Sequence, residues 1–501
     1  MEIYKKNTYF VKIFVIIGDF DLNNKSLSKN YVFNLISQFL TIITPLITTP
    51  YVSRVLGADG IGEYSYVYSF VSYFSMFGML GIATYGQLII AQIRDEKKRL
   101  SKTFWEVYVA QCTSMLLSIL LYFLLLVYGN FVYKNMLFAL VIMLFAQLFD
   151  ITWFFQGIEN FKGIVLKNLV IKLLGTILIF ILVKSKKDLY IYAVILQGST
   201  FLGNLSLWKY IFKTISFVTL KNIKFWKHWK GCMLFFIPTI ATSVYTVLDK
   251  SMVGIITGST LQNGYYEQAH KIEQIMATIV TAISTVILPR IAYLNSIGNY
   301  TQIRKIQQMS FEFILFSSFP LSFGLAAIAP NLIPVFLGEG YDACIPILQI
   351  FCLLIILLGL DNLIGKQYLM AQNKQNYFNI GVIIGAFINF LFNCFMIKIW
   401  GSLGAAISSV VAELSILIVF IFFTKCDVDY KWICQKSFKY IFASLLMGIS
   451  VFFMGKTVPQ NICGILIQIM SGAVMYALLM FLAKDKPFIL ILTKIKSHLR
   501  R

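Results

Sequence analysis

The sequence predicts an all-α polytopic membrane protein of about 14 transmembrane helices, in two similar six-helix halves followed by two further C-terminal helices. Three observations support this prediction. The chain of 501 residues is 58% hydrophobic and 13% charged, and its mean hydropathy is +0.77. Long apolar segments run through it with little sequence between them. The first and seventh of these segments carry matching stripes of hydroxyl and amide side chains.

The apolar segments have the length of membrane-spanning helices. A bilayer core takes about 20 apolar residues per helix, whereas a transmembrane strand alternates over about 10 residues. The segments are apolar on most faces, so helices are predicted, and no separate soluble domain fits in the remaining sequence. The predicted spans are residues 30–56, 63–90, 104–128, 135–157, 163–183, 189–212, 232–257, 265–288, 308–329, 344–370, 377–398, 402–424, 438–455 and 461–483.

The distribution of Lys and Arg predicts the orientation. Basic residues gather in the segments at both ends of the chain and in the loops after even-numbered spans, which places both termini in the cytoplasm. The net charge of +21 is therefore mostly a signal of topology, and anionic membrane lipids are the expected neighbours of these loops. Nucleic acid is a poor alternative partner, because the basic residues flank hydrophobic spans instead of clustering on one soluble face.

Two stretches about 200 residues apart indicate a duplication. The first span is followed by VLGADGIGEYSYVYSF and the seventh by IITGSTLQNGYYEQAHKI, so that glycine, a short turn, glycine and tyrosine recur. Six spans in each half give both halves the same orientation. The predicted parts are a cytoplasmic N-terminal segment (1–29), an N-lobe (30–212), a basic cytoplasmic linker (213–230), a C-lobe (231–424), two additional spans (425–483) and a basic cytoplasmic tail (484–501).

Polar stripes mark one face of several spans. Gln38 and Thr41 lie on such a face of the first span, and in the eighth span polar residues follow Glu267 at steps of four, three, four, three and four. Two interpretations remain open: helix packing, and a water-filled cavity between the halves. The cavity is favoured because Glu267 and Lys271 need solvent or partners. The stripe of the eighth span consists of Glu267, Lys271, Gln274, Thr278, Thr281 and Thr285.

Several charged residues fall inside the predicted spans. An unpaired charge at the bilayer centre costs a few kcal/mol even on lenient scales, so each should face a cavity or a partner. Lys172 reaches the membrane surface by snorkelling, pairs with an acid such as Asp150, or is a cationic contact for an anionic substrate. Asp249 and Lys250 form an ion pair, an interfacial anchor or part of an outer gate.

The remaining charges also allow two roles. Lys366 and Arg54 are membrane anchors or ligands, and Glu413 is a proton or cation site or a buried hydrogen-bonded acid. The candidate substrate-binding residues are Gln38, Thr41, Arg54, Lys172, Lys250, Lys271, Gln274, Thr278 and Lys366. The candidate ion-coupling residues are Asp150, Asp249, Glu267, Asp361 and Glu413.

Enzymatic signals are weak. The sequence contains no Walker loop, zinc motif or nucleophile elbow, and its eight cysteines show no metal-ligand spacing, so neither a metal nor a cofactor is expected. DVD at Asp427 to Asp429 resembles the metal-binding DxD of glycosyltransferases, but a single copy in a short loop favours coincidence. The protein is therefore not expected to be an enzyme.

Two stretches resemble a known family of transporters. LDKSMVGIITGSTLQNGYYEQAHKIEQI and TTPYVSRVLGADGIGEYSYVYSF are similar to the signature regions of lipid-linked oligosaccharide flippases, the Wzx or RfbX-type polysaccharide transporters. The resemblance implies the fold of the multidrug/oligosaccharidyl-lipid/polysaccharide exporters. In that fold two six-helix bundles form a V around a central cavity, here with two extra C-terminal helices.

The same resemblance implies a function. Such proteins move an undecaprenyl-diphosphate-linked oligosaccharide from the cytoplasmic to the outer leaflet of the bacterial plasma (inner) membrane by alternating access, for O-antigen, capsule or exopolysaccharide synthesis. A polysaccharide polymerase and glycosyltransferases are the implied partners, and H⁺ or Na⁺ the implied coupling ion. Two alternatives remain: a cation-coupled multidrug exporter of this fold, and a membrane O-antigen polymerase or ligase. The last usually needs a large external loop, and every predicted external loop here is short.

Overall fold

The computed structural model describes residues 25–158, 161–212, 214–218, 224–372, 374–425, 427–485 and 487–489. These ranges fold into helices and contain no strand, which confirms the all-α class. Each predicted span falls mainly on helical residues, as expected in lipid, where a helix satisfies its own backbone hydrogen bonds. The span 135–157 is interrupted between α5 (Lys134–Leu148) and α6 (Thr152–Gly157). Within the described ranges, nine helical segments are long and apolar enough to cross a membrane. The total of 14 spans stays a prediction.

The chain forms two compact units, and their boundary falls between residues 267 and 268. This point lies inside α10 (Thr260–Ser296). Consequently α9 (Trp226–Thr257), the first helix of the predicted second half, belongs to the compact unit that contains the first half. The lobe boundaries drawn from the sequence remain a prediction.

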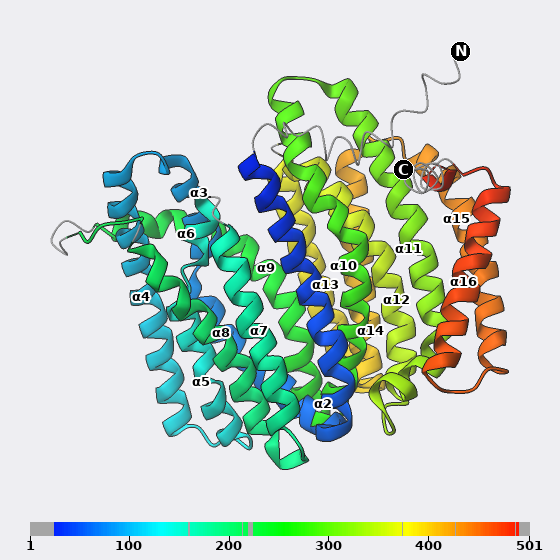
Figure 1. Cartoon of the computed structure of the whole chain (residues 1–501), viewed down its shortest axis with the longest axis horizontal. Helices are drawn as coiled ribbons and strands as arrows, with labels where there is room; N and C mark the ends of the chain where they lie inside the picture. Colours follow the sequence, from blue (N-terminus) through cyan, green and yellow to red (C-terminus); the bar gives the residue numbers. More distant parts are fainter. Residues whose placement is uncertain are drawn as a thin grey trace. The chain divides into compact units, whose positions relative to one another are not determined.

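The first unit is a bundle in which α2 packs against α4, α5, α7 and α9. Figure 1 shows α4, α5, α7 and α8 running side by side. The short 3₁₀-helix η1 (Lys186–Asp188) connects two of the helices. The helices of this unit are α2 (Lys25–Met79), α3 (Ile82–Ile93), α4 (Lys97–Tyr128), α5 (Lys134–Leu148), α6 (Thr152–Gly157), α7 (Phe161–Leu182), α8 (Leu189–Ile211) and α9.

Two glycines divide the start of the chain into separate helical arms. Gly57 has φ 71° and ψ 170°, a backbone conformation that breaks α2 into arms before and after it. Gly81 has φ 72° and precedes α3, so the second predicted span bends before it ends. Glycine suits both positions, because positive φ carries no Cβ penalty there.

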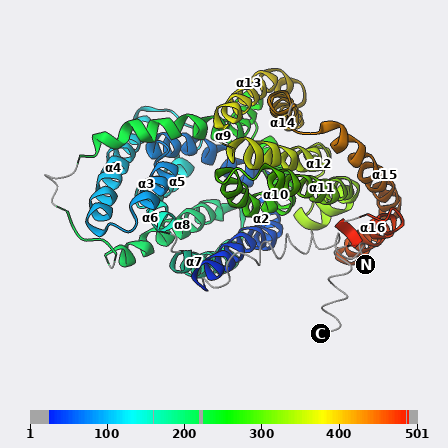
Figure 2. The ribbon, with the colours of Figure 1, turned by 90° about the horizontal axis from the view of Figure 1, so that it is seen from above.

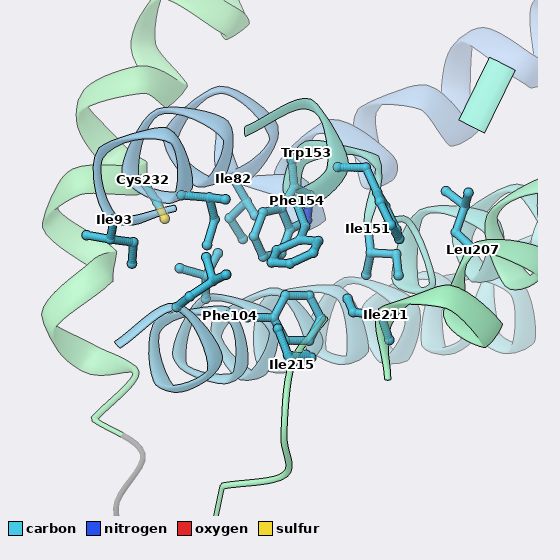
Figure 3. Close-up of a cluster of buried hydrophobic side chains, with 14 residues drawn as sticks. Ile82, Ile93, Phe104, Ile151, Trp153, Phe154, Leu207, Ile211, Ile215 and Cys232 are labelled. Atoms are coloured by element: carbon cyan, nitrogen blue, oxygen red, sulfur yellow. The ribbon is translucent and has the colours of Figure 1, made fainter. Parts of the chain in front are cut away.

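A buried aromatic cluster fixes one end of the first unit. Figure 3 shows Phe104 of α4 close to Trp153 and Phe154. The ring centroids of Phe104 and Trp153 lie 5.5 Å apart, and those of Phe104 and Phe154 lie 5.1 Å apart. Cys232 of α9 belongs to the same cluster. Close packing of this kind holds α9 against α3 and α4, because lipid offers little hydrophobic driving force between helices.

The second unit contains the rest of α10 and the helices that follow it. In Figure 2, α13 and α14 form one pair and α15 and α16 another, and the second pair packs on α11. A π-helix, η3 (Asn362–Met370), directly continues α12 after Asp361, and such segments often mark functional sites. The helices are α11 (Tyr300–Leu337), α12 (Cys344–Asp361), α13 (Gln375–Trp400), α14 (Ser402–Thr424), α15 (Tyr430–Gly455) and α16 (Ile462–Leu482).

Candidate functional site

The two glycine-rich stretches found in the sequence pack against each other. A Cβ on Gly62 would lie 1.7 Å from the carbonyl oxygen of Thr260, and a Cβ on Gly264 would lie 1.9 Å from that of Ala58. Gly264 and Thr260 each stand 202 positions after Gly62 and Ala58, so the contact is reciprocal. Two copies of one element related by a local two-fold axis make contacts of this kind. Only glycine lets α2 and α10 approach so closely.

Next to this contact lies a group of charged and hydroxyl side chains, here named the Glu267 cluster (Ser65, Asp249, Lys250, Tyr266 and Glu267). The Lys250 ammonium lies 2.7 Å from Oε2 of Glu267, and the Ser65 hydroxyl donates to the same oxygen at 2.8 Å. The Tyr266 hydroxyl donates to Oδ2 of Asp249 at 2.5 Å. Each buried carboxylate of the cluster therefore has a local donor.

Hydroxyl groups continue from this cluster along α2 and α9. Ser251 Oγ lies 2.9 Å from Ser69 Oγ and 2.9 Å from the Tyr73 hydroxyl. Serine and tyrosine hydroxyls can donate and accept, so these contacts tolerate rearrangement. Together with the Glu267 cluster they hold the C-terminal end of α9 against α2.

The N-terminal end of α9 is held by a second group, the Glu106 cluster (Tyr85, Glu106, Lys227 and His228). Glu106 lies on α4 and its side chain is fully buried. Its Oε2 lies 2.6 Å from the Lys227 ammonium and 3.1 Å from Nε2 of His228, and its Oε1 accepts from the backbone N–H of Lys224 at 3.1 Å. A buried carboxylate with three donors stays ionised at little cost.

The proton arrangement on His228 follows from its partners. Burial lowers the pKa of His228 from its usual value, although the nearby Glu106 carboxylate opposes the shift. We therefore assign a neutral imidazole, in which Nε2–H donates to Glu106 and Nδ1 accepts from the Tyr85 hydroxyl at 2.7 Å. Tyr85 belongs to α3, so the Glu106 cluster joins α3, α4 and α9.

The two clusters are separated by the length of α9. From His228 to Lys250 the helix rises about 33 Å at 1.5 Å per residue, which matches the thickness of a bilayer core. The same helix is thus anchored by polar contacts at positions suited to the two faces of a membrane.

Three of the buried acids of the second unit are here named the acid cluster (Glu273, Asp361 and Glu413). They lie on α10, α12 and α14, and Glu413 is close enough to interact electrostatically with both of the others. Neither oxygen of Asp361 has a hydrogen-bond partner among the described residues. His270 Nδ1 lies 3.3 Å from Oε2 of Glu273. Carboxylates that crowd together in a low dielectric cannot all remain charged.

Comparison with known proteins decides the family. The model of the polysaccharide biosynthesis protein family matches residues 27–295, which is more than half of the chain. The chain belongs to this family. A candidate O-antigen transporter of Escherichia coli (strain K12) is 26% identical over 412 residues, which cover 80% of this chain and 98% of that relative. The polysaccharide transporter family predicted from the two sequence stretches is confirmed.

Solved structures of related transporters share the fold. The lipid II flippase MurJ in its inward closed conformation has a TM-score of 0.74 at 18% identity, over 91% of this chain and 99% of that one. The MATE multidrug transporter DinF-BH has a TM-score of 0.57 at 15% identity, over 81% of this chain and 96% of that one. This member of the polysaccharide biosynthesis family is therefore a multi-pass membrane protein with the helical fold of these transporters.

The other candidate residues differ in their surroundings. Lys172 is exposed on α7, and the described residues show no ion pair between it and Asp150, whose Oδ1 accepts from the backbone N–H of Thr152 at 2.8 Å. Arg54 and Gln274 are exposed, and Lys271 is half-buried. Lys366 is exposed on η3, near the charge of Glu413.

The hydroxyl stripe of the eighth span is bonded to its own helix. Thr278 donates to the carbonyl of Gln274 at 2.7 Å, and Thr281 to that of Ala277 at 2.9 Å. These bonds are the ones expected of the packing interpretation. The cavity stays a prediction. The side chains of Gln38 and Thr41 lie outside the described residues.

Several residues of these clusters are not among the candidates predicted from the sequence, including Glu106, Glu273 and Lys227. Glu106 was overlooked, although an acid three positions inside the predicted span 104–128 was a visible signal. Glu273 was overlooked because it lies off the polar stripe of the eighth span. Lys227 was used only for topology, since its acidic partner lies more than 100 positions earlier in the chain.

Proposed function

We propose that this protein is a flippase that moves undecaprenyl-diphosphate-linked oligosaccharide repeat units from the cytoplasmic to the outer leaflet of a bacterial plasma membrane. The product would serve O-antigen, capsule or exopolysaccharide synthesis. The observation that carries the proposal is the anchoring of α9 at both ends by the Glu106 and Glu267 clusters, in a chain of the polysaccharide biosynthesis family.

Alternating access requires that contacts at the two membrane faces open in turn. With both termini in the cytoplasm, as the basic segments indicate, the Glu106 cluster lies at the cytoplasmic face and the Glu267 cluster at the outer face. Release of one end of α9 then opens a path to one face while the other end stays bound. Polar contacts suit such gates, because each contributes only about 0.6 to 2 kcal/mol within a membrane.

The acid cluster is the proposed coupling site. Glu273, Asp361 and Glu413 crowd together, so uptake of protons or of Na⁺ would relieve their repulsion. Asp150 and Glu267 are weaker candidates, because the first accepts from a backbone N–H and the second is paired with Lys250. Ion binding at the acid cluster would favour one conformation over the other, which is what coupling requires.

Lys172 remains a proposed contact for the diphosphate. Its ammonium is exposed on α7, at about mid-membrane depth by the predicted topology, where an exposed cation needs an anionic partner or water. The substitution Lys172→Ala is expected to reduce polysaccharide export without lowering membrane abundance. Normal export at equal abundance would remove Lys172 from the site.

A multidrug exporter is the second candidate function, favoured by the likeness to the fold of the MATE transporter. The deciding experiment measures the leaflet distribution of undecaprenyl-diphosphate-linked repeat units in cells with and without the protein. Accumulation in the inner leaflet on deletion, reversed by re-expression, supports the flippase. An unchanged distribution, with small cations bound by the purified protein, supports drug export instead.

A further inference from the structure

A cavity of about 320 Å³ lies in the second unit between the start of α11 and the start of α15. It lies apart from the acid cluster, whose residues do not line it. Ile303 and Ile306 of this part of α11 pack in a buried cluster with nonpolar residues of α10, which holds it in place. Ligand sites commonly have volumes of about 300 to 1,000 Å³ and combine apolar walls with a few polar groups.

One amide nitrogen of the lining has no hydrogen-bond partner in the part of the chain that the structure describes. Gln307 is buried, and among the described residues its Nε2 has no hydrogen-bond partner. A buried N–H without an acceptor destabilises the folded protein. The presence of Gln307 at this position is explained if a ligand in the cavity supplies the acceptor. The orphaned amide therefore indicates a ligand with an oxygen acceptor.

The DVD sequence of the loop between α14 and α15 lines the same cavity. Asp429 caps α15 by accepting from the backbone N–H of Trp432 at 3.0 Å. The Lys374 ammonium lies 2.7 Å from Oδ2 of Asp427 and, with Tyr368, holds the pKa of Asp427 below its usual value. Asp427 is bonded to Lys374 and Tyr368, and Asp429 is bonded to the backbone of Trp432. A carboxylate has about four acceptor sites, so both acids can accept a further bond from a ligand hydroxyl.

The balance of charge in the lining distinguishes between classes of ligand. Asp427 and Asp429 contribute two negative charges, which are balanced by Arg304 of the lining and by Lys374, the partner of Asp427. A phosphate would meet both carboxylates and no excess of positive charge, which disfavours it against a neutral ligand. Trp432 and Phe311 add aromatic surface, which packs against the C–H face of a sugar ring while the amides and acids bond its hydroxyls.

We propose that the cavity between α11 and α15 binds a neutral sugar residue, through Gln307, Asp427, Asp429 and the ring of Trp432. The inference deepens the proposed function and rests on it, because it gives the sugar part of the substrate a binding place on the second unit. By the predicted topology the cavity opens toward the cytoplasm, where the repeat unit is made.

Binding can be measured directly on the full chain in lipid nanodiscs, without transport. Saturation-transfer NMR would use glucose, N-acetylglucosamine and maltose as probes, and inorganic pyrophosphate as the competing anion. We expect saturation transfer to sugar ring protons in the wild type, and about tenfold weaker apparent affinity in Gln307→Leu and in Trp432→Leu. Gln435→Leu is the matched control, since Gln435 is an exposed amide on α15 outside the lining.

Thermal unfolding separates lost binding from misfolding. Gln307→Leu removes an unpartnered amide, so its melting temperature without sugar should equal or exceed that of the wild type. Absence of sugar signals in the wild type, or equal affinity in Gln307→Leu, would overturn the site while leaving the flippase proposal intact. Binding of pyrophosphate in place of sugar would also overturn it. If the protein binds sugar but its deletion leaves the leaflet distribution of the repeat units unchanged, the sugar site would stand and the flippase proposal would be wrong.

Discussion

At the scale of single residues, the buried carboxylates have two kinds of surroundings. Glu106 and Glu267 each accept from a lysine and at least one further donor, so both can stay ionised without solvent. Asp361 has no hydrogen-bond partner among the described residues and instead lies beside another acid. The first arrangement forms a contact that can open and close, whereas the second favours uptake of a cation.

Substitution of Glu106 tests the first arrangement. Glu106→Gln weakens the bonds to Lys227 and His228, and every 1.4 kcal/mol lost shifts the closed state about tenfold toward the open one. We expect reduced flipping and increased thiol reactivity of a cysteine placed beside Tyr85. Glu96→Gln is the matched control, because Glu96 pairs with Arg99 on the exposed surface, where such pairs contribute little.

A charge exchange tests whether the contact is electrostatic. Glu106→Lys alone places two cations together and should abolish export, and Lys227→Glu in the same chain should restore part of it. Normal export in the Glu106→Lys variant would show that the cluster is not a gate.

Neutralisation of Asp361 tests the second arrangement. Asp361→Asn imitates the protonated acid, so the variant should bind substrate but lose the dependence of transport on the ion gradient. Its melting temperature should not fall, since a buried charge is removed. Asp342→Asn, at an exposed position before α12, is the control. Transport by Asp361→Asn that still follows the gradient would exclude Asp361 as the coupling residue.

At the scale of helices, the contact between α2 and α10 depends on two small residues. Gly62→Ala and Gly264→Ala each place a methyl group within 2 Å of a carbonyl oxygen of the other helix, so the helices must separate. We expect each variant to lose about 2 kcal/mol or more of stability and to loosen the Glu267 cluster. Thermal unfolding in detergent measures the loss.

The matched control for these glycines lies in α8. A Cβ on Gly198 would meet no atom within 4 Å, so Gly198→Ala should be neutral or stabilising by up to about 1 kcal/mol. If the Gly62→Ala variant were as stable as the Gly198→Ala variant, α2 and α10 would not be in close contact at Gly62.

At the scale of the whole molecule, the length and apolar character of the segments were enough to predict where the helices lie. The repeat of glycine and tyrosine also predicted a duplication, and Gly62 and Gly264 lie in reciprocal positions. Sequence could not show which charges meet. Glu106 finds Lys227 and His228 about 120 positions later, and Glu273 meets Glu413 from another helix, because such pairs depend on packing and not on spacing along the chain.

The orientation of the molecule can be tested with two of its own cysteines. Cys434 lies near the start of α15 and Cys463 at the start of α16, and both are exposed. The helices pack as a hairpin, so these thiols lie at opposite ends, and α15 rises about 32 Å from Cys434 to Gly455 at 1.5 Å per residue. The positive-inside pattern of the loop before α15 predicts that Cys434 faces the cytoplasm and Cys463 the outside.

The experiment uses chains that keep only one of these cysteines, with the others replaced by alanine. A thiol reagent that cannot cross the membrane should label Cys463 in intact cells and Cys434 only after permeabilisation. The reverse pattern would place the termini outside, and with them the Glu106 cluster. In the proposed mechanism the substrate is loaded from the face where the Glu106 cluster opens. With the reverse orientation, export would have to begin at the Glu267 end of α9, which contradicts the proposed direction of transport.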